Sequence, residues 1–341
     1  MAKLWFALRL FAASLRVLRR RLASGPRRPG WSWVQESVIE AMRRNGAHLM
    51  ALPIADARRH VDALAPSGRR RGVRREPCQV AGLNGCRFIP ATAAATGNPT
   101  TLLYLPGGGY AFGSVRSYAD FLARVSRASG ARVLALEYPH APEHRFPAAP
   151  EACLAAYRAL VAEGTRPEDI VLGGDSAGGG LALTILLALR DAHEAQPRGA
   201  VLISPWVDLS ASQPSVTAHD RYDWGDRAYL VHWASLYLGE ADPRDPRASP
   251  LFADLHGIAP LLIQVGSAEL LFDEVTALAR RAREAGVAVD LKTWDDMTHA
   301  WMLVPDVFPQ ATPALELVAQ FLTTPGLHAV IERTPHGVTD E

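Results

Sequence analysis

After residue 72 the chain alternates short apolar runs with longer segments of helical periodicity. The apolar runs lie at residues 102–105, 133–136, 170–172, 201–203 and 261–265. Runs of this kind are typical of strands buried on both faces of a parallel sheet. Helices are expected near residues 117–129, 148–163, 177–190, 273–285 and 311–322, with a last strand at 287–294. The alternation predicts an α/β fold with a mostly parallel, doubly wound sheet, whose functional loops follow the carboxyl ends of its strands.

Two regions stand apart from this alternation. Short strands at 73–80 and 86–89 are predicted to be joined through the turn pair Asn84-Gly85. Residues 206–250 contain several tryptophans and prolines, which indicates an excursion over the sheet edge. The expected organisation is therefore an N-terminal helical segment at 1–50, an α/β domain at 51–324 that includes this excursion, and a flexible tail at 325–341.

The first 28 residues contain eight basic and no acidic side chains. Large apolar residues recur there at spacings of three and four, which predicts an amphipathic helix: Leu4, Leu8, Phe11, Leu15, Leu18 and Leu22. Arg9 and Arg16 interrupt the apolar region that a secretory signal needs, and no stretch has the roughly 18 uncharged apolar residues that span a bilayer. Two interpretations remain for residues 1–28. The favoured one is a helix packed on the protein itself, and the other is peripheral contact with a membrane surface.

Composition excludes some classes of partner. The formal net charge of +1 gives no global reason to expect nucleic acid. Cys78, Cys86 and Cys153 are odd in number and lack the spacing of a zinc site, so they favour a reducing, cytoplasmic compartment. The sequence leaves the oligomeric state open, a homodimer included.

A glycine-rich segment at residues 172–180 follows one predicted strand and precedes a predicted helix. It lacks the lysine of a phosphate-binding loop and the glycine spacing of a dinucleotide loop. Residues 174–178 instead match Gly-x-Ser-x-Gly, a pattern that presents a serine on a tight strand-to-helix turn. Ser176 is therefore the candidate nucleophile, although this pentapeptide alone also fits a simple turn of small residues.

A nucleophilic serine needs a base, a group that orients the base, and donors for an oxyanion. The base should follow the last strand, where His299 stands. The acid should follow the strand that ends near residue 265. Glu269 and Asp273 both follow that strand. Glu269 is preferred because it lies in the loop itself, whereas Asp273, kept as the alternative, stands where it could cap the next helix.

The oxyanion donors are expected from two strand ends. A second glycine cluster follows the strand that ends at Leu105. The backbone amides of Gly108 and Gly109, together with that of Ala177, are the candidate donors. The competing interpretation of this cluster is a flexible turn.

Four segments in this order resemble the hormone-sensitive-lipase-type branch of the α/β-hydrolases, the bacterial family IV esterases and lipases. They are residues 106–110 (Pro-Gly-Gly-Gly-Tyr), 138–149 (Tyr-Pro-His-Ala-Pro-Glu-His-Arg-Phe-Pro-Ala-Ala), 174–179 (Gly-Asp-Ser-Ala-Gly-Gly) and 296–299 (Asp-Met-Thr-His). The resemblance implies an α/β-hydrolase fold and cofactor-independent hydrolysis of short to medium acyl esters. It also implies an N-terminal helical cap, which we assign to residues 1–50, with the apolar stripe of residues 4–22 packed over the pocket. Two residues depart from the family pattern: Pro106 replaces a histidine of the oxyanion loop, and Glu269 replaces the usual aspartate.

Alternatives follow from the same residues. A lactone hydrolase or a deacetylase would use the same three side chains. A ligand-binding receptor on this fold is the alternative of another class, and His299 argues against it because receptors that resemble this branch have lost that histidine. Residues 140–144 match the string His-x-x-Glu-His of some zinc enzymes, but Pro142 opposes the helix that zinc binding there requires. The sequence therefore predicts no metal, no cofactor and a small-molecule ester as substrate.

Overall fold

Eight strands form one twisted sheet in the order β1-β2-β4-β3-β5-β6-β7-β8. The computed structural model describes residues 2–65, 72–92 and 100–324. The first three strands in this order pair antiparallel and the other pairs are parallel. The strands are β1 (Val73–Val80), β2 (Leu83–Pro90), β3 (Thr101–Leu105), β4 (Arg132–Leu136), β5 (Ile170–Asp175), β6 (Gly199–Ile203), β7 (Leu261–Gly266) and β8 (Val289–Trp294).

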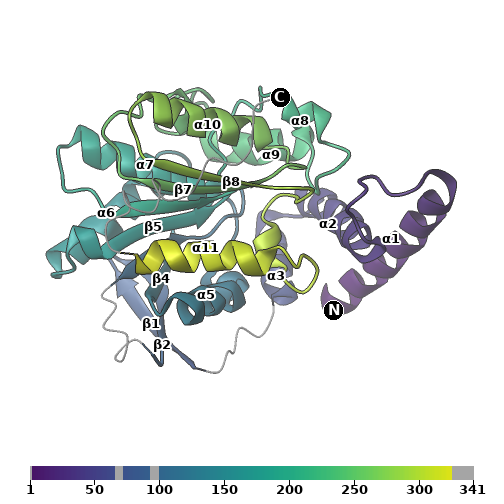
Figure 1. Cartoon of the computed structure of the whole chain (residues 1–341), viewed down its shortest axis with the longest axis horizontal. Helices are drawn as coiled ribbons and strands as arrows, with labels where there is room; N and C mark the ends of the chain where they lie inside the picture. Colours follow the sequence, from purple (N-terminus) through teal and green to yellow (C-terminus); the bar gives the residue numbers. More distant parts are fainter. Residues whose placement is uncertain (1, 66–71, 93–99, 325–341) are drawn as a thin grey trace.

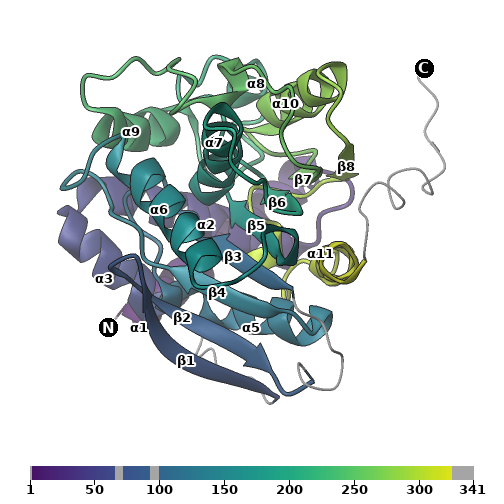
Figure 2. The same cartoon turned by 90° about the vertical axis from the view of Figure 1, so that its left-hand side faces the viewer.

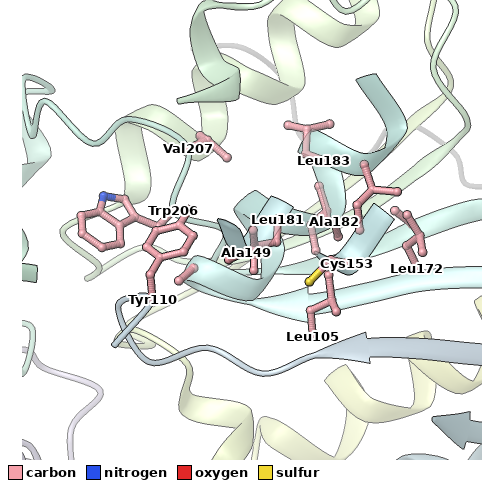
Figure 3. Close-up of a cluster of buried hydrophobic side chains, with 14 of the residues drawn as sticks. Leu105, Tyr110, Ala149, Cys153, Leu172, Leu181, Ala182, Leu183, Trp206 and Val207 are labelled. Atoms are coloured by element: carbon pink, nitrogen blue, oxygen red, sulfur yellow. The ribbon is translucent and has the colours of Figure 1, made fainter. Parts of the chain in front are cut away.

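Helices cover both faces of the sheet (Figures 1 and 2). One face carries α5 (Val115–Ser129) and α11 (Ala311–Thr323), and the other carries α6 (Ala148–Ala162), α7 (Ala177–Asp191) and α10 (Phe272–Glu284). Side chains alternate along a strand, so successive residues of the sheet contribute to the two hydrophobic cores on its opposite faces. Figure 3 shows part of the core between the sheet and helices α6 and α7, where Leu105 and Leu172 of the sheet lie near Cys153 of α6 and Leu181 of α7.

The predicted α/β architecture is confirmed, and each of the five predicted helices begins and ends within two residues of its expected bounds. The predicted turn at Asn84-Gly85 is wrong. The turn between β1 and β2 is Ala81-Gly82, and both residues have the positive φ (48° and 79°) that a tight two-residue hairpin requires. Gly85 instead lies in β2, where a Cβ atom would collide with the carbonyl of Ala135 in β4.

Three helices precede the sheet: α1 (Ala2–Ser24), α2 (Trp33–Ala51) and α3 (Ile54–Leu64). Figure 1 shows α1 at the margin of the molecule, with α2 between α1 and the sheet. Arg20 and Arg21 of α1 donate hydrogen bonds to the buried Glu36 carboxylate of α2, at 2.6 and 3.1 Å. Within the described ranges, every helix falls short of the length and apolar character that a bilayer crossing requires.

The excursion predicted at 206–250 lies between β6 and β7 and contains α8 (Ser215–Ala218) and α9 (Arg227–Leu238). Trp206 and Trp233 anchor it, since each is about 2% exposed or less. The described residues also include short 3-10 helices at Pro167–Asp169, Pro250–Phe252 and Trp301–Leu303. The tail predicted at 325–341 lies outside the described residues.

Candidate active site

Ser176 stands at the junction of β5 and α7 in a backbone conformation that a non-glycine residue rarely adopts. Its φ is +51°, and a conformation of this kind costs on the order of 1–3 kcal/mol. Flanking glycines make the turn possible, because a Cβ at Gly174 would collide with the backbone of Gly178. The turn is held by the Ser176 amide, which donates to the Ile203 carbonyl at 3.0 Å, and by its carbonyl, which accepts from the Trp206 amide at 2.9 Å. Ser176 is partly exposed and lines a cavity.

His299 and Glu269 meet beyond the ends of β8 and β7. The distance from His299 Nδ1 to Glu269 Oε2 is 3.2 Å, and the Glu269 side chain is fully buried. The other carboxylate oxygen of Glu269 accepts hydrogen bonds from the Ser204 hydroxyl at 2.7 Å and from the Gly266 amide at 2.6 Å. These bonds fix the carboxylate on the Nδ1 side of the imidazole, which leaves Nε2 as the lone-pair nitrogen when Nδ1 carries the hydrogen.

Burial and charge act in opposite directions on this pair. Desolvation lowers the pKa of His299, but the hydrogen bond and charge of Glu269 and the charges of Asp223 and Asp175 outweigh it and hold the pKa above the ordinary 6.5. Desolvation raises the pKa of Glu269, and the hydrogen bonds from His299 and Ser204 offset part of that rise. The site therefore favours a histidine more basic than usual.

Asp273, the alternative acid, is directed elsewhere. Its Oδ2 accepts a hydrogen bond from the Ser215 amide at 2.8 Å, and its own backbone amide donates to the Ser215 hydroxyl at 3.1 Å. The expected capping role is wrong, because Leu271 is the N-cap of α10 and Asp273 lies inside the first turn. The structure brings Glu269, and not Asp273, to His299.

The glycine loop after β3 presents unpaired amides. Gly108 and Gly109 have φ values of 127° and 58°, and both line the same cavity as Ser176 and His299. Within residues 2–65, 72–92 and 100–324, the amides of Gly108, Gly109 and Ala177 have no hydrogen-bond acceptor. Amides without an acceptor can donate hydrogen bonds to a negatively charged oxygen in the cavity.

Asp175 holds the glycine loop in place. Its carboxylate is about 1% exposed and accepts hydrogen bonds from the Gly107 amide at 3.0 Å and from the Tyr104 and Tyr118 hydroxyls at 2.8 and 2.7 Å. Desolvation raises the pKa of Asp175, and these three donors counter that rise. Sequence reasoning treated this position as the variable residue of the serine motif, and the tyrosine before the glycine loop was the signal that could have revealed its partner.

Pro106, which replaces the family histidine, is fixed through its carbonyl. That oxygen accepts a hydrogen bond from the Tyr138 hydroxyl at 2.7 Å, and both groups are buried. The loop is thus held by a tyrosine on one side and by Asp175 on the other. Rigidity of the loop does not depend on a histidine at this position.

Asp223 connects the two loops that carry His299 and Glu269, and sequence reasoning missed it. Its carboxylate is fully buried and accepts from the His299 amide at 3.0 Å and from the Leu270 amide at 2.9 Å. Its backbone carbonyl accepts from the Arg43 guanidinium of α2, at 2.8 and 3.1 Å. One residue of the excursion therefore ties the base loop, the acid loop and an N-terminal helix together.

Ser176 and His299 open into a cavity of about 320 Å³. Its walls are largely apolar and come from α2, α3, α9 and the loops after β7 and β8. The apolar side chains include Met42, Leu49, Val61, Leu64, Leu230 and Leu271. The cavity suits an apolar chain attached to a group that reaches Ser176.

The prediction that the α1 stripe packs over this pocket is wrong. Leu4 is 68% exposed and Leu22 is 81% exposed, and the described residues of α1 do not line the cavity. The helix packs through its opposite face, where Ala13 and Val17 are buried. The position over the pocket is occupied by α2 and α3.

The His-x-x-Glu-His segment at residues 140–144 is not helical, as Pro142 predicts. Residues 141–144 form a turn and not a helix, and Glu143 pairs with Arg58 at 2.7 Å. Burial lowers the pKa of His140 to about 4. In the described part of the chain, no group of three or more histidine, cysteine or acidic side chains is arranged to hold a metal ion.

Known proteins share this arrangement of elements. The alpha/beta hydrolase fold family matches residues 102–303. An acetyl-hydrolase from Streptomyces hygroscopicus is 47% identical over 225 residues, 66% of this chain and 75% of that protein. An esterase from Acinetobacter venetianus is 34% identical over 255 residues, 73% of this chain and 81% of that protein. The crystal structure of an esterase from the bacterial hormone-sensitive lipase family matches with a TM-score of 0.77 and 39% identity, covering 84% of this chain and 97% of that one.

Proposed function

Because the chain belongs to the α/β-hydrolase fold family and is a carboxylic ester hydrolase similar to bacterial hormone-sensitive-lipase-type esterases, we propose that it works through an acyl-enzyme on Ser176. One observation carries the proposal: the strained serine, the imidazole of His299 held by Glu269, and the unpaired glycine amides all meet at one cavity. Each part supplies one requirement of nucleophilic catalysis.

Acylation begins when Ser176 Oγ attacks the carbonyl carbon of the ester and His299 Nε2 takes the hydroxyl proton. The carbonyl oxygen becomes an oxyanion, which accepts hydrogen bonds from the amides of Gly108, Gly109 and Ala177. The C–O bond to the alcohol then breaks, and the imidazolium returns its proton to the departing oxygen. Glu269 stabilises the imidazolium and keeps its orientation throughout.

Deacylation repeats these steps with water. His299 removes a proton from water as its oxygen attacks the acyl carbon, and the second oxyanion occupies the same three amides. Collapse of this intermediate breaks the bond to Ser176 Oγ, which recovers its proton from His299. The carboxylic acid leaves and the free enzyme returns.

The substrates proposed are short to medium acyl esters. The apolar cavity of about 320 Å³ supports an acyl chain of limited length, and the name acetyl-hydrolase on one relative supports the short end of the range. Lactone hydrolysis and deacetylation use the same steps and remain within this proposal. Against a receptor without catalysis stands His299, which receptors that resemble this branch have lost and which here contacts Glu269.

A series of chromogenic esters of increasing acyl length tests the substrate range. We expect kcat/KM to be highest for short or medium chains and to fall for chains too long for a cavity of about 320 Å³. Ser176→Ala assayed in parallel identifies background hydrolysis. A steady rise of kcat/KM to the longest acyl chains would contradict the proposed range.

The pH dependence of kcat/KM should report the environment of His299. The base must be neutral, so activity is expected to fall as the pH drops through a value above 6.5, the ordinary pKa of histidine. The direction follows from Glu269 and Asp223, whose negative charges favour the protonated imidazole. Initial rates at low substrate concentration across the acid range measure this limb. A limb at or below 6.5 would contradict the upward shift of the His299 pKa.

A further inference from the structure

The outer face of α1 carries a continuous row of exposed apolar side chains. This row, called the outer stripe below, has exposed fractions from 44% to 81%; its members are Leu4, Leu8, Phe11, Leu15, Leu18 and Leu22. At 1.5 Å per residue the stripe is about 27 Å long. The opposite face of the helix already packs on the protein through Ala13 and Val17. The outer stripe is therefore additional apolar surface that the fold itself leaves uncovered.

The start of α2 extends this surface. Trp33 and Val34 are 45% and 53% exposed, and the Trp33 indole N–H donates to the Ser14 carbonyl of α1 at 3.2 Å. Among the described residues, the only other large apolar side chain with comparable exposure is Val231 of α9. Exposed apolar surface is thus concentrated at the N-terminal end of the chain.

Positive charge flanks the outer stripe. Arg19 lies four residues after Leu15 and three before Leu22, which places it beside the stripe. It has no acidic partner among the described residues. Residues 1–28 hold eight of the chain's 36 lysines and arginines and none of its 35 acidic residues, so the rest of the chain is net acidic. Arg16, Arg20 and Arg21 pair with acidic residues of α2. The surface therefore combines an apolar row with a basic border in which Arg19 is the arginine without an acidic partner.

We propose that the outer stripe and its basic border bind an anionic membrane surface. A helix with an apolar face and basic flanks lies in the interfacial plane, where its apolar side chains enter the acyl region and its cations meet anionic headgroups. The exposed tryptophan at the start of α2 is of the type enriched at that depth. The helix is already folded on the body through the bonds from Arg20 and Arg21 to Glu36, so binding requires no new helix.

A second copy of the chain is the competing occupant, and charge opposes it. Two outer stripes placed face to face would bring Arg19 of each copy together, and Arg19 has no acidic partner among the described residues, whereas Arg16 pairs with Glu40 of its own chain. The rest of the described surface offers only Val231 as a comparable exposed apolar group. Anionic lipid satisfies both the apolar and the charged parts of the surface.

Cosedimentation of the full chain with vesicles tests the proposal. The probes are vesicles of phosphatidylcholine alone and of an equal mixture of phosphatidylcholine and phosphatidylglycerol, each at low and high salt. The wild-type chain should pellet with the anionic vesicles and be released by salt. The variant Phe11→Ser/Leu15→Ser should lose at least about tenfold in affinity, because it removes two large apolar side chains from the contact. Val231→Ser, which removes an exposed apolar group elsewhere, should bind as the wild type does.

Hydrolysis of a soluble ester by the same preparations separates this proposal from the catalytic one. All variants should keep their activity, because they lie outside the cavity walls. The proposal is overturned if the wild type stays in the supernatant, binds both kinds of vesicle equally, or binds as well after the double substitution. Concentration-dependent self-association that the double variant abolishes, without vesicle binding by the wild type, would assign the surface to a second copy instead.

Discussion

Ser176→Ala is expected to lower kcat/KM for a chromogenic ester by on the order of 10⁴- to 10⁶-fold, because a triad serine and its base act as one unit. The methyl group keeps the size of the side chain and removes the oxygen that forms the acyl bond. Intact-mass spectra after treatment with an activated phosphonate ester check the same point. The wild type should gain one adduct and Ser176→Ala should gain none.

A matched control is available in Ser235, whose exposed hydroxyl donates to the His232 carbonyl at 2.8 Å. Ser235→Ala should keep both full activity and the phosphonate adduct. Circular dichroism and a thermal melt would establish that Ser176→Ala is folded. An adduct that persists on Ser176→Ala would show that another residue is the nucleophile.

Glu269→Gln is expected to lower kcat by about 10² to 10⁴ with little change in folding. The amide keeps the shape of the carboxylate and can still accept from Ser204 and Gly266. Its NH2 group, however, would donate to Nδ1 of His299 and place the imidazole hydrogen on Nε2, where a base needs its lone pair. Loss of the carboxylate charge should also move the acid limb of the pH profile to lower pH, since Glu269 raises the pKa of His299.

Asp273→Asn is the matched control, because Asp273 is a nearby acidic residue, in the first turn of the helix that follows the Glu269 loop. Its hydrogen bonds go to Ser215, so the substitution should cost about 1 kcal/mol of stability and change kcat by no more than a few-fold. Steady-state kinetics and urea unfolding of both variants measure the difference. If Asp273→Asn lost the larger part of kcat, Asp273 would be the acid.

Local periodicity explains why much of the fold could be predicted. Runs such as 201–203 and 261–265 are buried on both faces, so nearly every position is apolar, Gln264 being the exception, and each strand can be recognised without its partners. The hairpin turn was misplaced because Asn84-Gly85 has the composition of a tight turn. The demand for glycine at position 85 comes from β4, which lies some fifty residues further along the chain, and no local pattern reveals such a neighbour.

The candidate site likewise contains residues whose positions could be predicted from the sequence and others that could not. Ser176 and His299 follow strand ends, where topology gathers functional groups, so their positions could be predicted while their catalytic roles stay predictions. Asp223 lies in an irregular segment, and its importance comes from the amides of His299 and Leu270, which reach it only in the folded chain. The outer stripe of α1 was recognisable as apolar, but an amphipathic pattern does not say what the apolar face meets.

The division between the cavity walls and the reacting groups has a consequence for evolution. Ser176, His299 and Glu269 are anchored on strand ends by buried carboxylates and backbone bonds, whereas much of the wall comes from helices, as with Met42 and Leu49 of α2. Substitutions in those helical walls can alter which acyl group fits without rebuilding the reaction. Related enzymes can therefore change their ester specificity by single substitutions in these helices. Arg43 of α2 is more constrained, because its guanidinium donates hydrogen bonds to the Asp223 carbonyl.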